Sequence, residues 1–187
     1  MNVALSIGHH PAAQGCDTID GKWTEYSFWA TQLPLLADTL QRMGHEAHVV
    51  NRSDSGGKTP SYAAAACNAV NADLAIEFHF NSASSRAASG TETFYWATSA
   101  RGKIAAEMIQ QAMVEVLKLP DRGCKTIGHP SENAYEFFHR TSMPAILVEP
   151  AFAASNVTDN DRLQTRIGDL IIALAIAIDG YAKATGQ

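Results

Sequence analysis

Two histidines and two glutamates in this 187-residue sequence have the types and positions of a metal site. His9, His79 and Glu149 each lie at the end of a predicted strand, and Glu25 stands where a helix is predicted to start. Two imidazoles and a carboxylate suit catalytic zinc and leave a fourth position for water. A further carboxylate that does not bind the metal can act as a general base. These residue types therefore indicate metal-assisted hydrolysis.

Each residue also has an ordinary structural explanation. A histidine at a strand end is more often a loop residue than a ligand. Glu25, taken alone, is explained by the favourable interaction of an acidic residue in the first helical turn with the helix dipole. His79 is a stronger candidate, because alternation places it with Glu77 and Asn81 on one side of a buried strand. Buried polar neighbours need partners. Either Glu77 orients a ligand histidine, or it forms an ordinary salt bridge.

Glu149 follows the apolar run Ala-Ile-Leu-Val and precedes a proline. Its carboxylate is therefore expected to emerge from the core rather than from a solvated face. Buried glutamates are rare unless they are paired or functional. The sequence thus marks Glu149 as a functional candidate independently of the histidines.

Strands and helices are predicted to alternate along the whole chain. The predicted strands are residues 2–8, 47–51, 74–80, 91–97 and 145–148, and the predicted helices are residues 25–43, 63–70 (opened by Pro60), 103–118 and 159–178. This alternation predicts a single α/β domain with a largely parallel, twisted sheet and helices on both faces. Ligands bind outside the carboxyl ends of strands in such sheets, so His9, His79 and Glu149 are expected to meet at one edge.

Composition narrows the classes of partner. The formal charge of −5 gives no electrostatic reason to expect nucleic acid or an anionic membrane. The most apolar run, residues 170–178, is too short for a membrane helix. Three widely spaced cysteines without a CxxC pair suggest neither a thiolate zinc finger nor a disulfide framework. The first residues lack a basic region and a long apolar stretch, so we expect synthesis in the cytoplasm without a signal peptide.

Four segments that contain these residues resemble, in order, the zinc-dependent N-acetylmuramoyl-L-alanine amidases of the AmiC/CwlV type. These enzymes cut peptidoglycan between the sugar and the stem peptide. The similar segments are residues 6–9, residues 25–52, residues 78–81, and residues 141–149 with Phe152 and Asn156. The second of these segments contains Glu25, the predicted helix that Glu25 begins and a strand that ends in Asn-Arg. The resemblance extends from about residue 2 to residue 180.

The resemblance implies that His9, Glu25 and His79 bind Zn²⁺ and that Glu149 takes a proton from the attacking water. The sequence departs from the family pattern at three places. His10 and Pro11 replace the usual glycines, a glutamate stands at position 77 where a small residue is common, and a proline follows Glu149 directly. These departures leave open whether His10 replaces His9 as a ligand.

By this resemblance, residues 1–187 are expected to form one catalytic domain, without a separate wall-binding domain, that hydrolyses the amide between N-acetylmuramic acid and L-alanine. The expected partner is peptidoglycan, and the expected role is that of a phage endolysin that acts on the wall after release, in the host periplasm. Two alternatives stay open: a zinc carboxypeptidase or small-substrate amidohydrolase, and an inactive peptidoglycan-binding module. His129 and His139 are weaker candidates that could line a substrate groove. The oligomeric state is left open.

Overall fold

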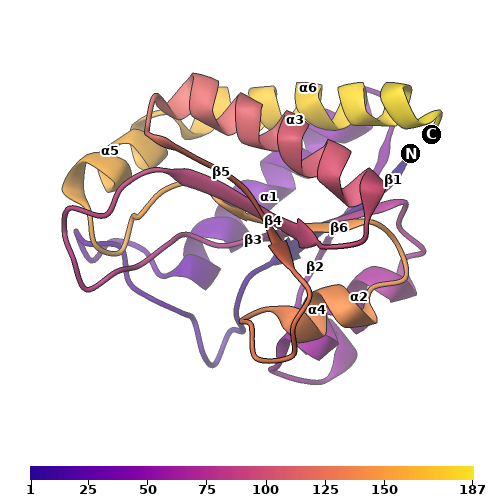
Figure 1. Cartoon of the computed structure of the whole chain (residues 1–187), viewed down its shortest axis with the longest axis horizontal. Coiled ribbons are helices and arrows are strands. Elements are labelled where there is room, and N and C mark those ends of the chain that lie inside the picture. The colour runs from indigo at the N-terminus through magenta and orange to yellow at the C-terminus, as the bar shows by residue number, and fades with distance from the viewer.

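A six-stranded sheet forms the middle layer of the protein in a computed structural model that describes residues 1–187 (Figure 1). The strands are β1 (Asn2–Ile7), β2 (Glu46–Val50), β3 (Leu74–Phe78), β4 (Thr91–Trp96), β5 (Asp121–Ile127) and β6 (Ala145–Glu149), in the order β2-β1-β3-β6-β4-β5. The first four strands in this order are parallel, whereas β4 runs antiparallel to β6 and parallel to β5. The prediction of a largely parallel sheet in an α/β domain is confirmed.

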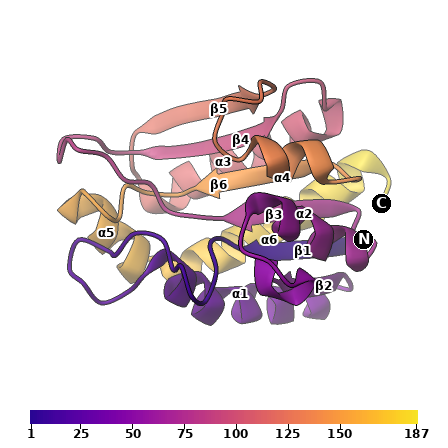
Figure 2. The same ribbon diagram turned by 90° about the horizontal axis from the view of Figure 1, so that it is seen from below.

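Helices cover both faces of the sheet (Figures 1 and 2). One face carries α1 (Glu25–Arg42), α3 (Ala100–Leu117) and α6 (Ile167–Thr185), and the other carries α2 (Pro60–Ala69) and α4 (Tyr135–Arg140). The short 3-10 helix η1 (Arg52–Ser55) follows β2, and α5 (Val157–Thr165) leads into α6. No helix is long and apolar enough to cross a membrane.

The interior strands β1 and β3 are buried on both faces, which explains their nearly continuous apolar sequence. Helix α1 buries one stripe of large side chains against the sheet at the spacing of an amphipathic helix, namely Phe28, Trp29, Leu33, Leu36 and Leu40. Its start is set by Thr24, whose side chain accepts a hydrogen bond from the Ser27 amide in a capping box. The cap makes Glu25 the first helical residue and thereby directs it to the edge of the sheet.

Four predictions about the elements were wrong or incomplete. Strand β5 was not predicted, because an edge strand that is largely exposed and polar has no buried face to give an apolar alternation. Helix α4 was missed because six residues are too few to show a helical period. The last predicted helix is in fact two helices, with Arg166 between them. In addition, β3 ends at Phe78, so His79 lies just after the strand rather than within it.

Candidate metal and catalytic site

His9, Glu25 and His79 meet at the carboxyl edge of β1 and β3. Their ligand atoms all lie within 4.8 Å of one another. His9 Nε2 is 3.1 Å from Glu25 Oε1, and His79 Nδ1 is 3.0 Å from Glu25 Oε2. The structure therefore brings together the three residues that the sequence singled out as a ligand set, although they come from separate segments of the chain.

Backbone amides hold the carboxylate of Glu25 between the two imidazoles. Glu25 is 4% exposed, and its oxygens accept hydrogen bonds from the amides of Cys16 and Phe80. Burial raises the pKa of Glu25, but the hydrogen bonds from His79 and His9 outweigh this effect and hold it well below its usual range. Glu25 is thus an anion with both oxygens directed at imidazoles.

The imidazole of His79 lies between two carboxylates. Its Nδ1 faces Glu25, and its Nε2 lies 3.7 Å from Glu77 Oε1. Burial lowers the pKa of His79, but the hydrogen bond to Glu25 and the nearby carboxylate of Glu77 outweigh burial and raise it to about 10. In the metal-free protein this imidazole is therefore protonated at neutral pH. Trp29 on α1 holds the backbone of the same residue, because the indole Nε1 donates a hydrogen bond to the carbonyl of His79.

His9, and not His10, contributes to the cluster. The His9 backbone has a φ of +66°, in the left-handed region that few residues other than glycine adopt. This conformation follows Gly8, where a Cβ atom would come within 2.3 Å of the Phe78 carbonyl oxygen. His10 instead accepts a hydrogen bond from the Ala12 amide.

Glu149 ends β6 with its carboxyl beside the cluster. Burial raises the pKa of Glu149, and although the charge of His79 opposes this, the neighbouring carboxylates of Glu25, Glu92 and Glu77 help to bring it to about 8. Its Oε2 is buried and has no hydrogen-bond partner. An unpartnered carboxyl next to a cluster of ligand atoms has the position that a general base requires.

Glu92 is a further residue of this edge, and no pattern in the sequence pointed to it. It lies directly opposite Glu149 in the antiparallel pairing of β4 with β6. Its carboxylate is 5% exposed and accepts hydrogen bonds from Asn81, Arg122 and Lys125. Only the reversed direction of β4 brings its amino end to the carboxyl end of β6, and the sequence pattern does not reveal strand direction.

Two adjoining cavities share Glu149. One, of about 290 Å³, is lined by the His9–Glu25–His79 cluster and by Glu77. The other, of about 330 Å³, is lined by residues of β4 and β6 that include Glu92, Phe94 and Leu147. Glu149 therefore lies between the cluster and a space that can receive part of a substrate.

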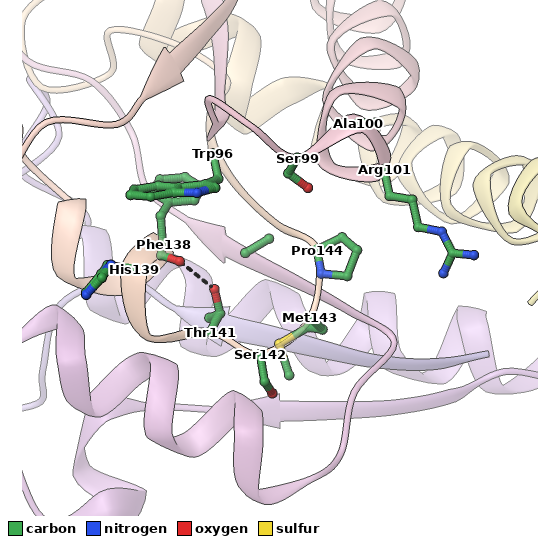
Figure 3. Close-up of a pocket in the computed structure, with 11 residues that line it drawn as sticks. Trp96, Ser99, Ala100, Arg101, Phe138, His139, Thr141, Ser142, Met143 and Pro144 are labelled. Atoms are coloured by element: carbon green, nitrogen blue, oxygen red, sulfur yellow. Dashed lines mark hydrogen bonds between the residues drawn. The ribbon is translucent and has the colours of Figure 1, made fainter.

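The two weaker histidine candidates lie outside these cavities. His129 is exposed on a loop, where its Nδ1 pairs with the Ser131 hydroxyl. His139 lines a separate hollow of about 470 Å³ with Trp96 and Arg101 (Figure 3). That hollow lies at the carboxyl end of β4 and the amino end of β6, opposite to the ends that carry Glu92 and Glu149.

The donor set of the cluster fits a divalent metal. Two imidazole nitrogens and a buried carboxylate are preferred zinc ligands, and three protein ligands are typical of catalytic rather than structural sites. His9 Nε2 and His79 Nδ1 both face the carboxylate of Glu25, so the three ligand groups converge on one point. The cluster can therefore hold a metal ion next to the unpartnered carboxyl of Glu149.

The comparisons with known proteins agree with this geometry. A family model described as N-acetylmuramoyl-L-alanine amidase matches residues 3–179. The N-acetylmuramoyl-L-alanine amidase LytC of Bacillus subtilis is 35% identical over 98 residues, which are 51% of this chain and 18% of LytC. The matched segment thus covers less than a fifth of the length of this relative.

Two solved structures have the same fold. The catalytic domain of CwlV, an N-acetylmuramoyl-L-alanine amidase from Paenibacillus polymyxa, is 22% identical with a TM-score of 0.80, covering 98% of this chain and 99% of that one. The N-acetylmuramoyl-L-alanine amidase AmiC2 of Nostoc punctiforme is 21% identical with a TM-score of 0.82, covering 98% of this chain and 97% of that one. At these sequence identities the likeness is evidence for a shared fold and for nothing more.

Proposed function

Since the chain belongs to the N-acetylmuramoyl-L-alanine amidase family, we propose that it is a zinc-dependent hydrolase that cleaves the amide between N-acetylmuramic acid and L-alanine in peptidoglycan. The observation that carries this proposal is the His9–Glu25–His79 cluster with the unpartnered carboxyl of Glu149 beside it. Family membership supplies the substrate class, and the cluster supplies the chemistry.

In this mechanism His9, Glu25 and His79 would hold the zinc. A bound zinc ion supplies Lewis acidity, which polarises a carbonyl and lowers the pKa of a water molecule. Glu149 takes the proton of the attacking water and later delivers it to the leaving amine. A carboxyl whose pKa is about 8 in the metal-free protein holds this proton readily, and a nearby dication favours its ionised form.

Residues around Glu149 keep its carboxyl in place for this role. The antiparallel pairing of β6 with β4 fixes its backbone, and Glu92 beside it is held by Asn81, Arg122 and Lys125. Phe94 and Leu147 line the cavity beside Glu149 and offer apolar contact to a substrate. A fixed backbone and fixed neighbours favour proton transfer to a defined oxygen of Glu149.

Mass analysis of digested peptidoglycan tests the proposal. Cleavage at the lactyl amide should release stem peptides with a free L-alanine amino group, and chelation should abolish this release until zinc is restored. A cut within the stem would support the carboxypeptidase or amidohydrolase alternative. Binding to peptidoglycan without cleavage would support the inactive module.

The place of action stays a prediction. A lysin made in the cytoplasm should accumulate there without lysis when it is expressed alone in a bacterium, and lysis should begin once the inner membrane is permeabilised. Lysis without permeabilisation would contradict this role while leaving the reaction itself untouched.

A further inference from the structure

Two buried polar residues, Asn51 and Arg52, follow β2. Asn51 contacts the backbone of His9, and Arg52 pairs with Glu77, which lies beside His79. We propose that Asn51 and the Arg52–Glu77 ion pair are positioning residues: one fixes the backbone of His9 and the other the ring of His79. The inference rests on the proposed zinc site and adds two contacts that set its affinity.

The first contact runs from Arg52 through Glu77 to His79. Arg52 Nη2 donates to Glu77 Oε1 at 3.0 Å, and the same oxygen lies 3.7 Å from His79 Nε2. Because His79 Nδ1 faces Glu25, Nδ1 is the nitrogen available to a metal and Nε2 is the nitrogen that carries the hydrogen. A carboxylate behind a ligand histidine fixes both its tautomer and its orientation.

Arg52 is required in this contact because Glu77 lies in the middle of the sheet. Glu77 is 0% exposed, between Ser6 of β1 and Leu147 of β6. A carboxylate at such a position is unfavourable unless a cation pairs with it. Arg52 is the only lysine or arginine in an ion pair with Glu77, and its Nη1 is held in turn by the Lys58 carbonyl.

The second contact runs from Asn51 to the backbone of His9. Asn51 Nδ2 donates to the carbonyls of Ile7 and His9, both at 3.0 Å. The Asn51 side chain is oriented by the start of η1, because its Oδ1 accepts from the Ser53 amide. A left-handed residue other than glycine persists only where its surroundings hold it, and the two bonds from Asn51 supply that support beside His9.

The two contacts share no atoms, so their effects should be independent. Removing the first with the double substitution Arg52→Met/Glu77→Leu leaves no unpaired buried charge, and apolar replacement of a buried ion pair commonly preserves the fold. Removing the second requires Asn51→Ala. Zinc affinity, measured by competition with a chelator, should fall about 10–100-fold in each variant. The losses should multiply when the variants are combined.

A conservative variant and a control separate positioning from general destabilisation. Arg52→Met/Glu77→Gln keeps an oxygen for His79 Nε2–H and should recover most of the affinity that Arg52→Met/Glu77→Leu loses. Asp159→Asn alters another fully buried carboxylate, which binds Ser89 and the amides of Gly90 and Phe152 away from the cluster. It should lower the melting temperature in the presence of a chelator but leave zinc affinity unchanged.

Nuclear magnetic resonance gives a second readout. In the zinc-loaded protein His79 should be protonated at Nε2, and protonation at Nδ1 would overturn the first contact. Wild-type zinc affinity in either variant would overturn the corresponding contact, and an equal loss of affinity in Asp159→Asn would overturn both. A wild-type protein that binds no zinc would instead refute the proposed function.

Discussion

The charged neighbours of Glu149 shift its pKa in opposite directions. The nearby carboxylates raise the pKa, and the imidazole of His79 lowers it. Nothing in the structure donates a hydrogen bond to Oε2 of Glu149. Because its pKa is raised to about 8, this group gains and loses a proton near neutral pH. Its role is therefore separable from that of the ligands by substitution.

Glu149→Gln should abolish most of the activity while leaving the fold and the zinc content intact. The change is nearly isosteric, but an amide cannot accept the proton of water, and removal of a general base lowers rates roughly 10²–10⁴-fold. Turnover on peptidoglycan and zinc content of the purified variant are the two measurements. Near-normal turnover would assign the base to another group, and loss of zinc would make Glu149 a fourth ligand.

The metal-free protein should become less stable as the pH rises from about 5 to 9. The pKa of Glu149 rises from an ordinary 4.5 to about 8 on folding, and that of His79 rises from 6.5 to about 10. Between the unfolded and folded values the native state binds more protons, so its free energy of unfolding falls with pH. Glu25 and Glu77, whose pKa values are lowered, contribute fully above about pH 4.5 and do not alter this trend.

Thermal unfolding at a series of pH values, in a chelator and with excess zinc, checks this dependence. Zinc requires neutral imidazoles, so the stabilisation that zinc adds should grow over the same range. A melting temperature of the chelated protein that stays level or increases from pH 6.5 to 9 would contradict the charge states assigned to His79 and Glu149.

At the scale of elements, the junction of β1 with β3 sets the separation of the two histidines. Gly8 donates its amide hydrogen to the Phe78 carbonyl, and each of the two residues immediately precedes a histidine of the cluster. Parallel pairing of β1 with β3 therefore fixes the distance between His9 and His79 before any ligand is bound. Residues that follow two parallel strands can meet in one site only when the strands are neighbours and end at the same level.

Gly8→Ala should reduce both stability and zinc affinity, because the new Cβ would lie 2.3 Å from the Phe78 carbonyl oxygen and the strands would have to separate. Gly168→Ala is the matched control. This glycine lies in α6, where a new Cβ would meet no atom within 4 Å, and alanine favours a helix by up to about 1 kcal/mol. Chemical denaturation and zinc titration of both variants test the junction. Equal stability and equal zinc affinity of the two variants would contradict the role of the junction between β1 and β3.

At the scale of the whole molecule, the cluster links the segment after β1, the first residue of α1 and the segment after β3. A ligand that binds only the native state stabilises it by RT ln(1 + [L]/Kd), or about 4 kcal/mol at a thousand-fold excess over Kd. Zinc should therefore raise the melting temperature of the entire domain in one transition. His79→Ala should remove this shift and stoichiometric zinc together, and a full zinc-dependent shift in that variant would exclude the proposed site.

Much of the architecture was predictable from the sequence alone. Apolar strands alternating with amphipathic helices require an α/β sheet that is covered on both faces, since each element has apolar surface to bury. The positions of His9, His79 and Glu149 at strand ends were predictable for the same reason, because a polar residue that interrupts a buried strand marks the point where the chain leaves the core.

Other features depended on the tertiary structure. The direction of β4 is a property of its pairing with β6, and it alone brings Glu92 beside Glu149. Strand β5 forms because the edge of β4 offers backbone partners, not because its own residues favour burial. Likewise, the sequence could not distinguish a salt bridge at Glu77 from orientation of His79, because both depend on where Arg52 lies in space. Local patterns record which surfaces must be buried, whereas strand pairing decides which polar groups meet.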